Sequence, residues 1–172
     1  MINNYPASSP IRRLLVANRG EIAIRIIKTA RRMGIHTIGI VTVSEPETDA
    51  DEAAFLDGTT LAETYLNGAA IIKLALEYHA EAIHPGYGFL SENSGFASLV
   101  QDAGLIFIGP SPDAMHQMGN KTNARKLAAS LNIPLTQAIY GSVEEILQHK
   151  EILAPPLLIK AAAGGGGKGM QL

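Results

Sequence analysis

Lysine and glycine residues near the C-terminal end of the sequence have the types and spacing needed to bind phosphate. A short apolar run ends in Lys160, and four consecutive glycines, Gly164 to Gly167, precede Lys168 and Gly169. Backbone N–H groups of glycine can approach phosphate oxygens closely, because no Cβ stands in the way. Lysine ammonium groups supply compact positive charge for the same oxygens. The pattern therefore predicts a flap that closes over a phosphate chain.

This glycine run differs from the P-loop of many nucleotide-binding proteins. The pattern G-x-x-x-x-G-K-[ST] requires glycine where Ala162 stands and serine or threonine where Gly169 stands. Four glycines also oppose helix nucleation, so we expect a strand–loop–strand arrangement, with the apolar pattern resuming at Met170. A flexible surface linker is the alternative interpretation.

A third lysine, Lys121, opens a predicted helix over residues 122–131. The helix dipole favours anions at that end, so a cation there is more easily explained if it faces a bound phosphate. A solvated lysine is the alternative.

The ten residues from His84 to Asn93, HPGYGFLSEN, form a second candidate site. They follow a short apolar segment, and ligands of open α/β sheets bind beyond the carboxyl ends of strands. We expect this loop to form a wall of a binding site. For His84 a packed, hydrogen-bonded structural role is favoured, because a single histidine without suitably spaced partners is weak evidence for a ligand.

The elements that must position these residues alternate between apolar strands and amphipathic helices. Continuous apolar strands favour a parallel sheet covered on both faces, and so an α/β fold. Only Gly20 of a G-x-G-x-x-G motif follows the first strand, which argues against a dinucleotide site. Strands are predicted at 14–17, 38–43, 81–83 and 105–108. Helices are predicted at 21–33, 67–79 and 94–102.

A shorter α–β–α–β stretch follows, and we place a domain boundary near residues 110–120. Pro112 is expected at the first position of a helix. A strand is predicted at 135–140, and Ser142 to Glu145 form a capping box for the next helix.

Composition excludes several classes of function. The sequence has 172 residues, 47% of them hydrophobic, a net charge of −2 and no cysteine. Bulk charge thus predicts neither nucleic-acid nor membrane binding, and no disulfide, thiolate metal site or cysteine nucleophile is possible. The sequence has neither an 18-residue apolar segment nor an apolar signal-peptide core. The absence of cysteine fits a protein of a reducing compartment. Basic residues within 12–32 and acidic residues within 45–57 predict two solvated surfaces, with a self-association contact as the alternative.

Five motifs in register closely resemble biotin carboxylases, the ATP-grasp subunits or domains of acetyl-CoA, propionyl-CoA, methylcrotonyl-CoA and pyruvate carboxylases. They are LVANRGEIA at 15–23, HPGYGFLSEN at 84–93, FIGP at 107–110, MGNK at 118–121 and KAAAGGGGKGM at 160–170. The resemblance implies a Rossmann-like parallel sheet, the pre-ATP-grasp domain, over residues 1–118. It implies that residues 119–172 are the incomplete start of an ATP-grasp domain.

The resemblance also implies an activity, its cofactors and its partners. The activity is ATP-dependent carboxylation of biotin with bicarbonate, using Mg²⁺ or Mn²⁺, with biotin held on a carboxyl carrier protein or domain. We expect a carboxyltransferase subunit as a partner and a cytoplasmic location. We also expect a homodimer that forms through the N-terminal domain, with the helix of Arg25 and Lys28 in the contact. There are two alternatives: part of another ATP-grasp ligase, similar to carbamoyl-phosphate synthetase, or a non-catalytic dimerisation module. The HPGYGFLSEN loop favours the carboxylases over the other ligases.

Individual site residues follow from the same resemblance. Those that match the family's ATP contacts are Lys121, Lys160, Gly164, Gly165, Gly166, Gly167, Lys168, Gly169 and Met170. Those in the loop at the biotin side are His84, Tyr87, Gly88 and Glu92. In this family the metal ligands, the bicarbonate-binding arginine and the general base lie beyond the flap. We therefore expect no catalytic residue and no metal site in these 172 residues, which alone should be inactive as the N-terminal portion of an enzyme.

Overall fold

The computed structural model describes residues 11–119, 121–152, 158–160 and 170–171. The chain divides into two compact units, Met1–Pro112 and Asp113–Leu172, which we describe separately.

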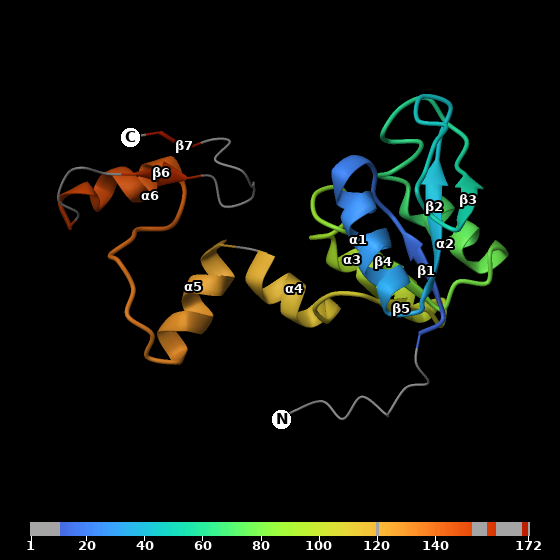
Figure 1. Ribbon diagram of the computed structural model, residues 1–172. Helices are drawn as coiled ribbons and strands as arrows, with labels where there is room; N and C mark the ends of the chain where they lie inside the picture. Colours follow the sequence, from blue (N-terminus) through green and yellow to red (C-terminus); the bar gives the residue numbers. More distant parts are fainter. Residues whose placement is uncertain (1–10, 120, 153–157, 161–169, 172) are drawn as a thin grey trace. The chain divides into compact units, whose positions relative to one another are not determined.

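The first unit is built on a five-stranded parallel sheet in the order β3-β2-β1-β4-β5 (Figure 1). Its central strand pairs on both sides, with Leu15 opposite Ile38 on one neighbour and opposite Ile83 on the other. The strands are β1 (Arg13–Val16), β2 (His36–Val41), β3 (Glu52–Phe55), β4 (Ala82–His84) and β5 (Ile106–Phe107). The predicted α/β fold with a parallel sheet is confirmed.

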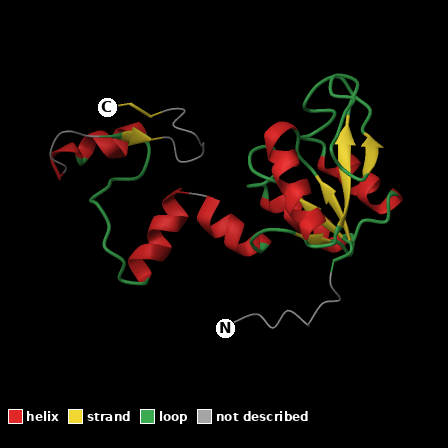
Figure 2. Ribbon diagram, viewed as in Figure 1, coloured by secondary structure: helices red, strands yellow, loops and turns green. Residues whose placement is uncertain are grey.

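Three helices cover the two faces of this sheet: α1 (Gly20–Arg32), α2 (Gly68–Glu77) and α3 (Ser94–Asp102) (Figure 2). Ala23 and Ile27 of α1 pack with Leu14 and Val16 of β1. Leu15 points to the opposite face because side chains alternate along a strand, and it is fully buried as well. Right-handed crossovers place α2 and α3 together on that opposite face. Burial of both faces explains the continuous apolar strands.

Helix ends follow the local sequence. The side chain of Asn67 accepts a hydrogen bond from the backbone N–H of Ala70 at 3.1 Å, and Asn93 caps α3 in the same way through Phe96 at 2.9 Å. Gly34 follows α1 with a φ of +75°, a left-handed conformation that favours glycine. These caps fix where each helix begins and ends, and so where the preceding loops must lie.

The first unit departs from the sequence expectation at residues 45–57. Strand β3 was not predicted, because only Ala54 of its four residues is fully buried and the segment is rich in acidic residues. The acidic side chains do not form a separate surface either. They pair with basic side chains of the first 32 residues, as Arg13–Glu52 at 2.9 Å, Arg19–Glu45 at 2.5 Å and Arg31–Asp51 at 2.8 Å. The two charged stretches predicted as solvated surfaces thus meet through ion pairs whose side chains stay partly exposed.

The second unit is mainly helical where it is described. Helix α4 (Pro112–Gly119) leads into it, and α5 (Lys121–Ser130), α6 (Val143–Gln148) and a 3₁₀ turn (Lys150–Ile152) follow. The predicted capping box is present, since Ser142 N donates to Glu145 Oε2 at 2.7 Å and Ser142 Oγ accepts from Glu145 N at 3.3 Å. Strand β6 (Ile159–Lys160) pairs antiparallel with β7 (Met170–Gln171).

The strand predicted at 135–140 was wrong. Those residues are a loop whose Leu135 and Tyr140 side chains are exposed, and among the described residues no strand lies beside them. The loop is held instead by Arg125, which donates to the carbonyl of Thr136 and to the hydroxyl of Tyr140. An apolar pattern alone does not make a strand without a partner for its backbone.

Candidate functional site

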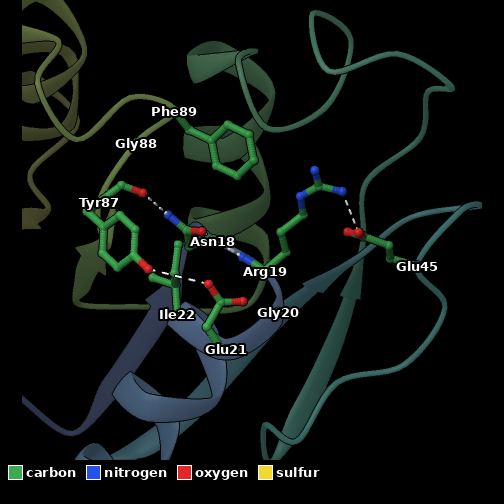
Figure 3. Close-up of a pocket in the computed structure, with 9 residues that line it drawn as sticks. All are labelled: Asn18, Arg19, Gly20, Glu21, Ile22, Glu45, Tyr87, Gly88 and Phe89. Carbon is green, nitrogen blue, oxygen red and sulfur yellow. Dashed lines mark hydrogen bonds and ion pairs between the residues drawn. The ribbon is translucent and has the colours of Figure 1, made fainter. Parts of the chain in front are cut away.

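A pocket lies at the place where the strand order of the sheet reverses. From β1 the chain continues to β2 and β3 on one side, whereas β4 and β5 lie on the other side. The loops after β1 and β4 therefore diverge, and such a switch point is where open α/β sheets bind ligands. The pocket has a volume of about 450 Å³. It is lined by residues 18–22, Glu45 and residues 87–89 (Figure 3).

Asn18 joins the two loops behind the pocket. It is buried, and its Nδ2 donates to the carbonyl oxygens of Pro85 at 2.7 Å and Tyr87 at 2.9 Å. Its Oδ1 accepts from the backbone N–H of Arg19 at 2.9 Å. One side chain thus ties the start of α1 to the loop after β4.

Gly86 makes this close approach possible. Its φ is +68°, and a Cβ at this position would lie 2.7 Å from Asn18 Nδ2 and 2.7 Å from Ile22 Cγ2. No side chain fits that space, so the glycine is required both by the backbone conformation and by the contact.

Arg19 closes one side of the pocket. Its Nη1 lies 2.5 Å from Glu45 Oε1, and its guanidinium carbon lies 5.5 Å from the ring centre of Phe89 and 5.8 Å from that of Tyr65. The two rings stack with their centres 5.2 Å apart. Burial, together with the nearby Glu45 carboxylate, raises the pKa of Tyr65, so this phenol stays neutral at physiological pH.

Tyr87 and Gly88 form the accessible part of the wall. Tyr87 is 64% exposed, and its hydroxyl donates to Glu21 Oε1 at 3.4 Å. Figure 3 shows its ring standing beside the pocket above Glu21 and Ile22. An exposed aromatic face next to glycine backbone suits a small ligand that has both apolar and polar parts.

The other two residues predicted for this loop do not line the pocket. His84 ends β4 and is half-buried, and its Nδ1 accepts from the backbone N–H of Gly86 at 3.0 Å. Burial lowers the pKa of His84, so the ring is neutral and holds the turn at Gly86. Glu92 is exposed and lies outside the lining.

The predicted phosphate-binding residues belong to the second unit. Lys121 begins α5, and Lys160 of β6 pairs in register with Met170 of β7. Residues Gly164, Gly165, Gly166, Gly167, Lys168 and Gly169 lie outside the described residues, as do the side chains of Lys121, Lys160 and Met170. The antiparallel pairing agrees with the expected strand–loop–strand arrangement, and the predicted ATP contacts stay a prediction.

Sequence reasoning did not single out Asn18, Arg19 or Glu45 as lining residues, whereas Phe89 lies in the loop predicted as a wall of the site. The available signal was their position: Asn18 and Arg19 directly follow the first strand, which the topology places beside the loop of Tyr87. Glu45 carried no such signal, because it comes from the acidic connection after β2.

The described residues contain neither a candidate metal site nor a candidate membrane span. No group of three or more His, Cys, Asp or Glu side chains is arranged to hold a metal ion there. Within the same residues, no helix has the length and apolar character needed to cross a bilayer.

Comparison with known proteins assigns both parts of the chain. The family described as "Biotin carboxylase, N-terminal domain" matches residues 10–115. The family described as "Carbamoyl-phosphate synthase L chain, ATP binding domain" matches residues 120–172.

Two curated relatives and one crystal structure illustrate the similarity. The biotin-dependent acyl-coenzyme A carboxylase alpha3 subunit of Mycobacterium leprae is 45% identical over 96% of this chain and 29% of its own length. Biotin carboxylase 2 of Bacillus subtilis is 43% identical over 92% of this chain and 37% of its own. The crystal structure is that of the biotin carboxylase domain dimer of Hydrogenobacter thermophilus 2-oxoglutarate carboxylase, in complex with MgADP, ADP and bicarbonate. It superposes on this chain with a TM-score of 0.88 at 40% sequence identity, and the match covers 95% of this chain and 38% of that one.

The chain thus spans less than two fifths of each of these three relatives. The match over residues 10–115 includes the whole parallel sheet and every residue that lines the pocket. The chain belongs to the biotin carboxylase family and contains its N-terminal domain.

Proposed function

We propose that the whole protein is a biotin carboxylase, to which this chain contributes the N-terminal part. In the proposed reaction ATP phosphorylates bicarbonate to carboxyphosphate and leaves ADP. Carboxyphosphate then breaks down to CO2 and phosphate, and the CO2 carboxylates N1 of biotin, which loses its proton. The observation that carries the proposal is the switch-point pocket, whose exposed Tyr87 and adjacent Gly88 belong to the region matched by the biotin carboxylase family. We propose that these two residues form the biotin-side wall, with His84 supporting the turn and Glu92 at the outer end of the loop.

The second unit is proposed to begin the ATP site, with the boundary between the domains at residues 118 and 119. The pairing of β6 with β7 supports a flap in which the glycines form the connection. The nucleotide contacts proposed are Lys121, Lys160, Gly164, Gly165, Gly166, Gly167, Lys168, Gly169 and Met170. The described residues offer no carboxylate cluster for Mg²⁺ or Mn²⁺, so we propose that the metal ligands come from elsewhere in the whole protein. The relative crystallised with MgADP and bicarbonate supports the proposal that the whole protein binds a nucleotide and bicarbonate.

The proposed partners follow from the same relatives. They are a biotin carboxyl carrier protein or domain, a carboxyltransferase subunit and a second copy of the protein. The dimeric state of the Hydrogenobacter domain supports the last of these, and the exposed Arg25 and Lys28 on α1 are the proposed contact. We also propose a cytoplasmic location, in keeping with the lack of cysteine.

Carbon fixation by the full-length protein tests this function. Radioactive bicarbonate should be incorporated into free biotin only when ATP is present, with one ADP formed per carboxylated biotin. Formation of carbamoyl phosphate from ammonia or glutamine, without dependence on biotin, would support the carbamoyl-phosphate synthetase alternative instead. Titration of the 172-residue chain with MgATP should show weak or no binding. Micromolar binding would contradict the proposal that most of the nucleotide site lies outside this chain.

A further inference from the structure

Asn18 is a buried polar residue that is hydrogen-bonded to the exposed wall of the pocket. It is only 1% exposed, and burying an amide is costly unless its polar atoms are hydrogen-bonded. Both Nδ2 protons have a carbonyl acceptor, at 2.7 Å and 2.9 Å, and Oδ1 has a backbone N–H donor at 2.9 Å. These partners fix the orientation of the amide, because a carbonyl can only accept and a backbone N–H can only donate. The side chain is therefore held in one orientation.

The two carbonyl groups that Asn18 binds flank Gly86, which begins a stretch with three positive φ angles. Pro85 and Tyr87 stand on either side of Gly86, and φ is +68° at Gly86, +72° at Gly88 and +42° at Phe89. Such conformations persist only when the surroundings hold them in place. Asn18 supplies that restraint at two points, and Asn18 and Ile22 occupy the space that a Cβ at Gly86 would need.

The next residue restrains the far end of the same stretch. The Arg19 backbone N–H binds Asn18 Oδ1, and the Arg19 guanidinium lies against the ring of Phe89. The restrained points are the Tyr87 carbonyl and the Phe89 ring, with Gly88 between them, and the turn that follows β1 supplies both restraints. Neither Asn18 nor its amide is exposed enough to act on a ligand itself.

We infer that Asn18 is a positioning residue that sets the place of Tyr87 and Gly88 for the biotin-side wall. This inference rests on the proposed function of that wall. Loss of the Nδ2 donors should free the Tyr87 carbonyl and let the wall move, while the flap of the second unit keeps its own structure.

Asn18→Asp and Asn18→Ala test the inference, and Asn67→Asp is the matched control. Aspartate at position 18 has nearly the same shape but no donors, and alanine removes the same bonds without adding charge. Asn67 serves only as an acceptor, through Ala70 N, so aspartate there keeps the cap. Amide exchange of residues 86–89 in this chain should become about tenfold faster in both Asn18 variants, and should not change in the control.

Kinetics of the full-length protein supply the second measurement. The KM for free biotin should rise about tenfold in the Asn18 variants, with the KM for ATP within about twofold of the original value. Folded variants with unchanged exchange in residues 86–89 and an unchanged KM for biotin would overturn the inference. A third outcome separates the two proposals. If amide exchange of residues 86–89 becomes faster in the Asn18 variants but the full-length original protein does not carboxylate biotin, Asn18 still restrains the loop and the proposed function is refuted. If neither variant folds, hydrogen exchange of the Asn18 side-chain amide protons in the original chain decides instead. Slow exchange would support the inference, because it shows that Asn18 keeps its hydrogen bonds, and fast exchange would overturn it.

Discussion

Glu45 and Arg19 form an ion pair in which Oε1 and Nη1 lie 2.5 Å apart across 26 residues of sequence. The pair joins the connection after β2 to the start of α1, and it holds the guanidinium against Tyr65 and Phe89. A segment that carried no signal of function in the sequence therefore borders the pocket.

Glu45→Gln should destabilise the folded protein only slightly. About two fifths of the arginine side chain and a third of the glutamate side chain are exposed, at 42% and 35%, so water screens the attraction. We expect the free energy of unfolding to fall by about 0.5 kcal/mol. Urea unfolding followed by circular dichroism measures this change, with Glu47→Gln on the same exposed connection as the control. A loss above about 2 kcal/mol would mean that the pair behaves as a buried one.

Gly86→Ala should be much more harmful than Gly88→Ala, although both glycines have positive φ. At Gly86 the new Cβ would meet Asn18 and Ile22 at 2.7 Å, whereas at Gly88 nothing lies within 4 Å. Gly88→Ala should therefore cost only the conformational strain, about 1 kcal/mol, and Gly86→Ala about 3 kcal/mol. Thermal unfolding of the two variants compares them directly. Equal losses would show that the contact with Asn18 has no energetic weight.

Asp51 should make stability depend on pH in the acid range. Hydrogen bonds from the side chain and backbone of Thr37, assisted by Arg31, lower the pKa of Asp51 from 3.8 to about 2. Because the folded pKa is depressed, the stabilisation is complete above about pH 4 and is lost as the pH falls towards 2. Solvent exposure reduces its size to about 1 kcal/mol.

Asp51→Asn tests this by removing the titrating group. Between about pH 5 and pH 2 the original chain should lose about 1 kcal/mol more unfolding free energy than the variant does. Asp49→Asn, on the same exposed connection, should follow the original curve. Parallel curves for the original chain and Asp51→Asn would show that the hydrogen bonds from Thr37 do not bias the protonation of Asp51.

Tyr87 should affect biotin affinity through its ring rather than its hydroxyl. The hydroxyl makes a long, exposed hydrogen bond of 3.4 Å to Glu21, so Tyr87→Phe should leave the KM for biotin within about twofold. Tyr87→Ala removes the aromatic face and should raise this KM about tenfold or more in the full-length protein. A similar large rise of the KM in both variants would show that the hydroxyl and not the ring forms the contact, and no rise in either would show that Tyr87 does not contact biotin.

Much of the first unit was predictable because its signals are local. Helix α3 has the predicted bounds of 94–102, and the Asn67 cap and the turn at Gly34 are also encoded by single residues. The central strands were predictable because they are buried on both faces. Strand β3 lies at the edge of the sheet and has one fully buried residue, so its pattern was too weak to recognise.

The pocket was only half predictable. The loop of Tyr87 was recognised because glycine, proline and tyrosine follow a strand, but its partners come from two other segments. Pairing between distant charges, such as Arg31 with Asp51, depends on the strand order and leaves no trace in local composition. For the same reason the sequence showed a basic stretch and an acidic stretch without showing that they meet.

The central position of β1 has a consequence for the order in which this domain can assemble. Strand β1 is made before the four strands that join it in the sheet, yet it lies in the middle of that sheet, and its second neighbour, Ala82–His84, is made much later. Until then the apolar side chains of Leu14, Leu15 and Val16 lack part of their covering, and one edge of their backbone is unpaired. Newly made chains halted before β4 should therefore be the species that most needs protection by chaperones.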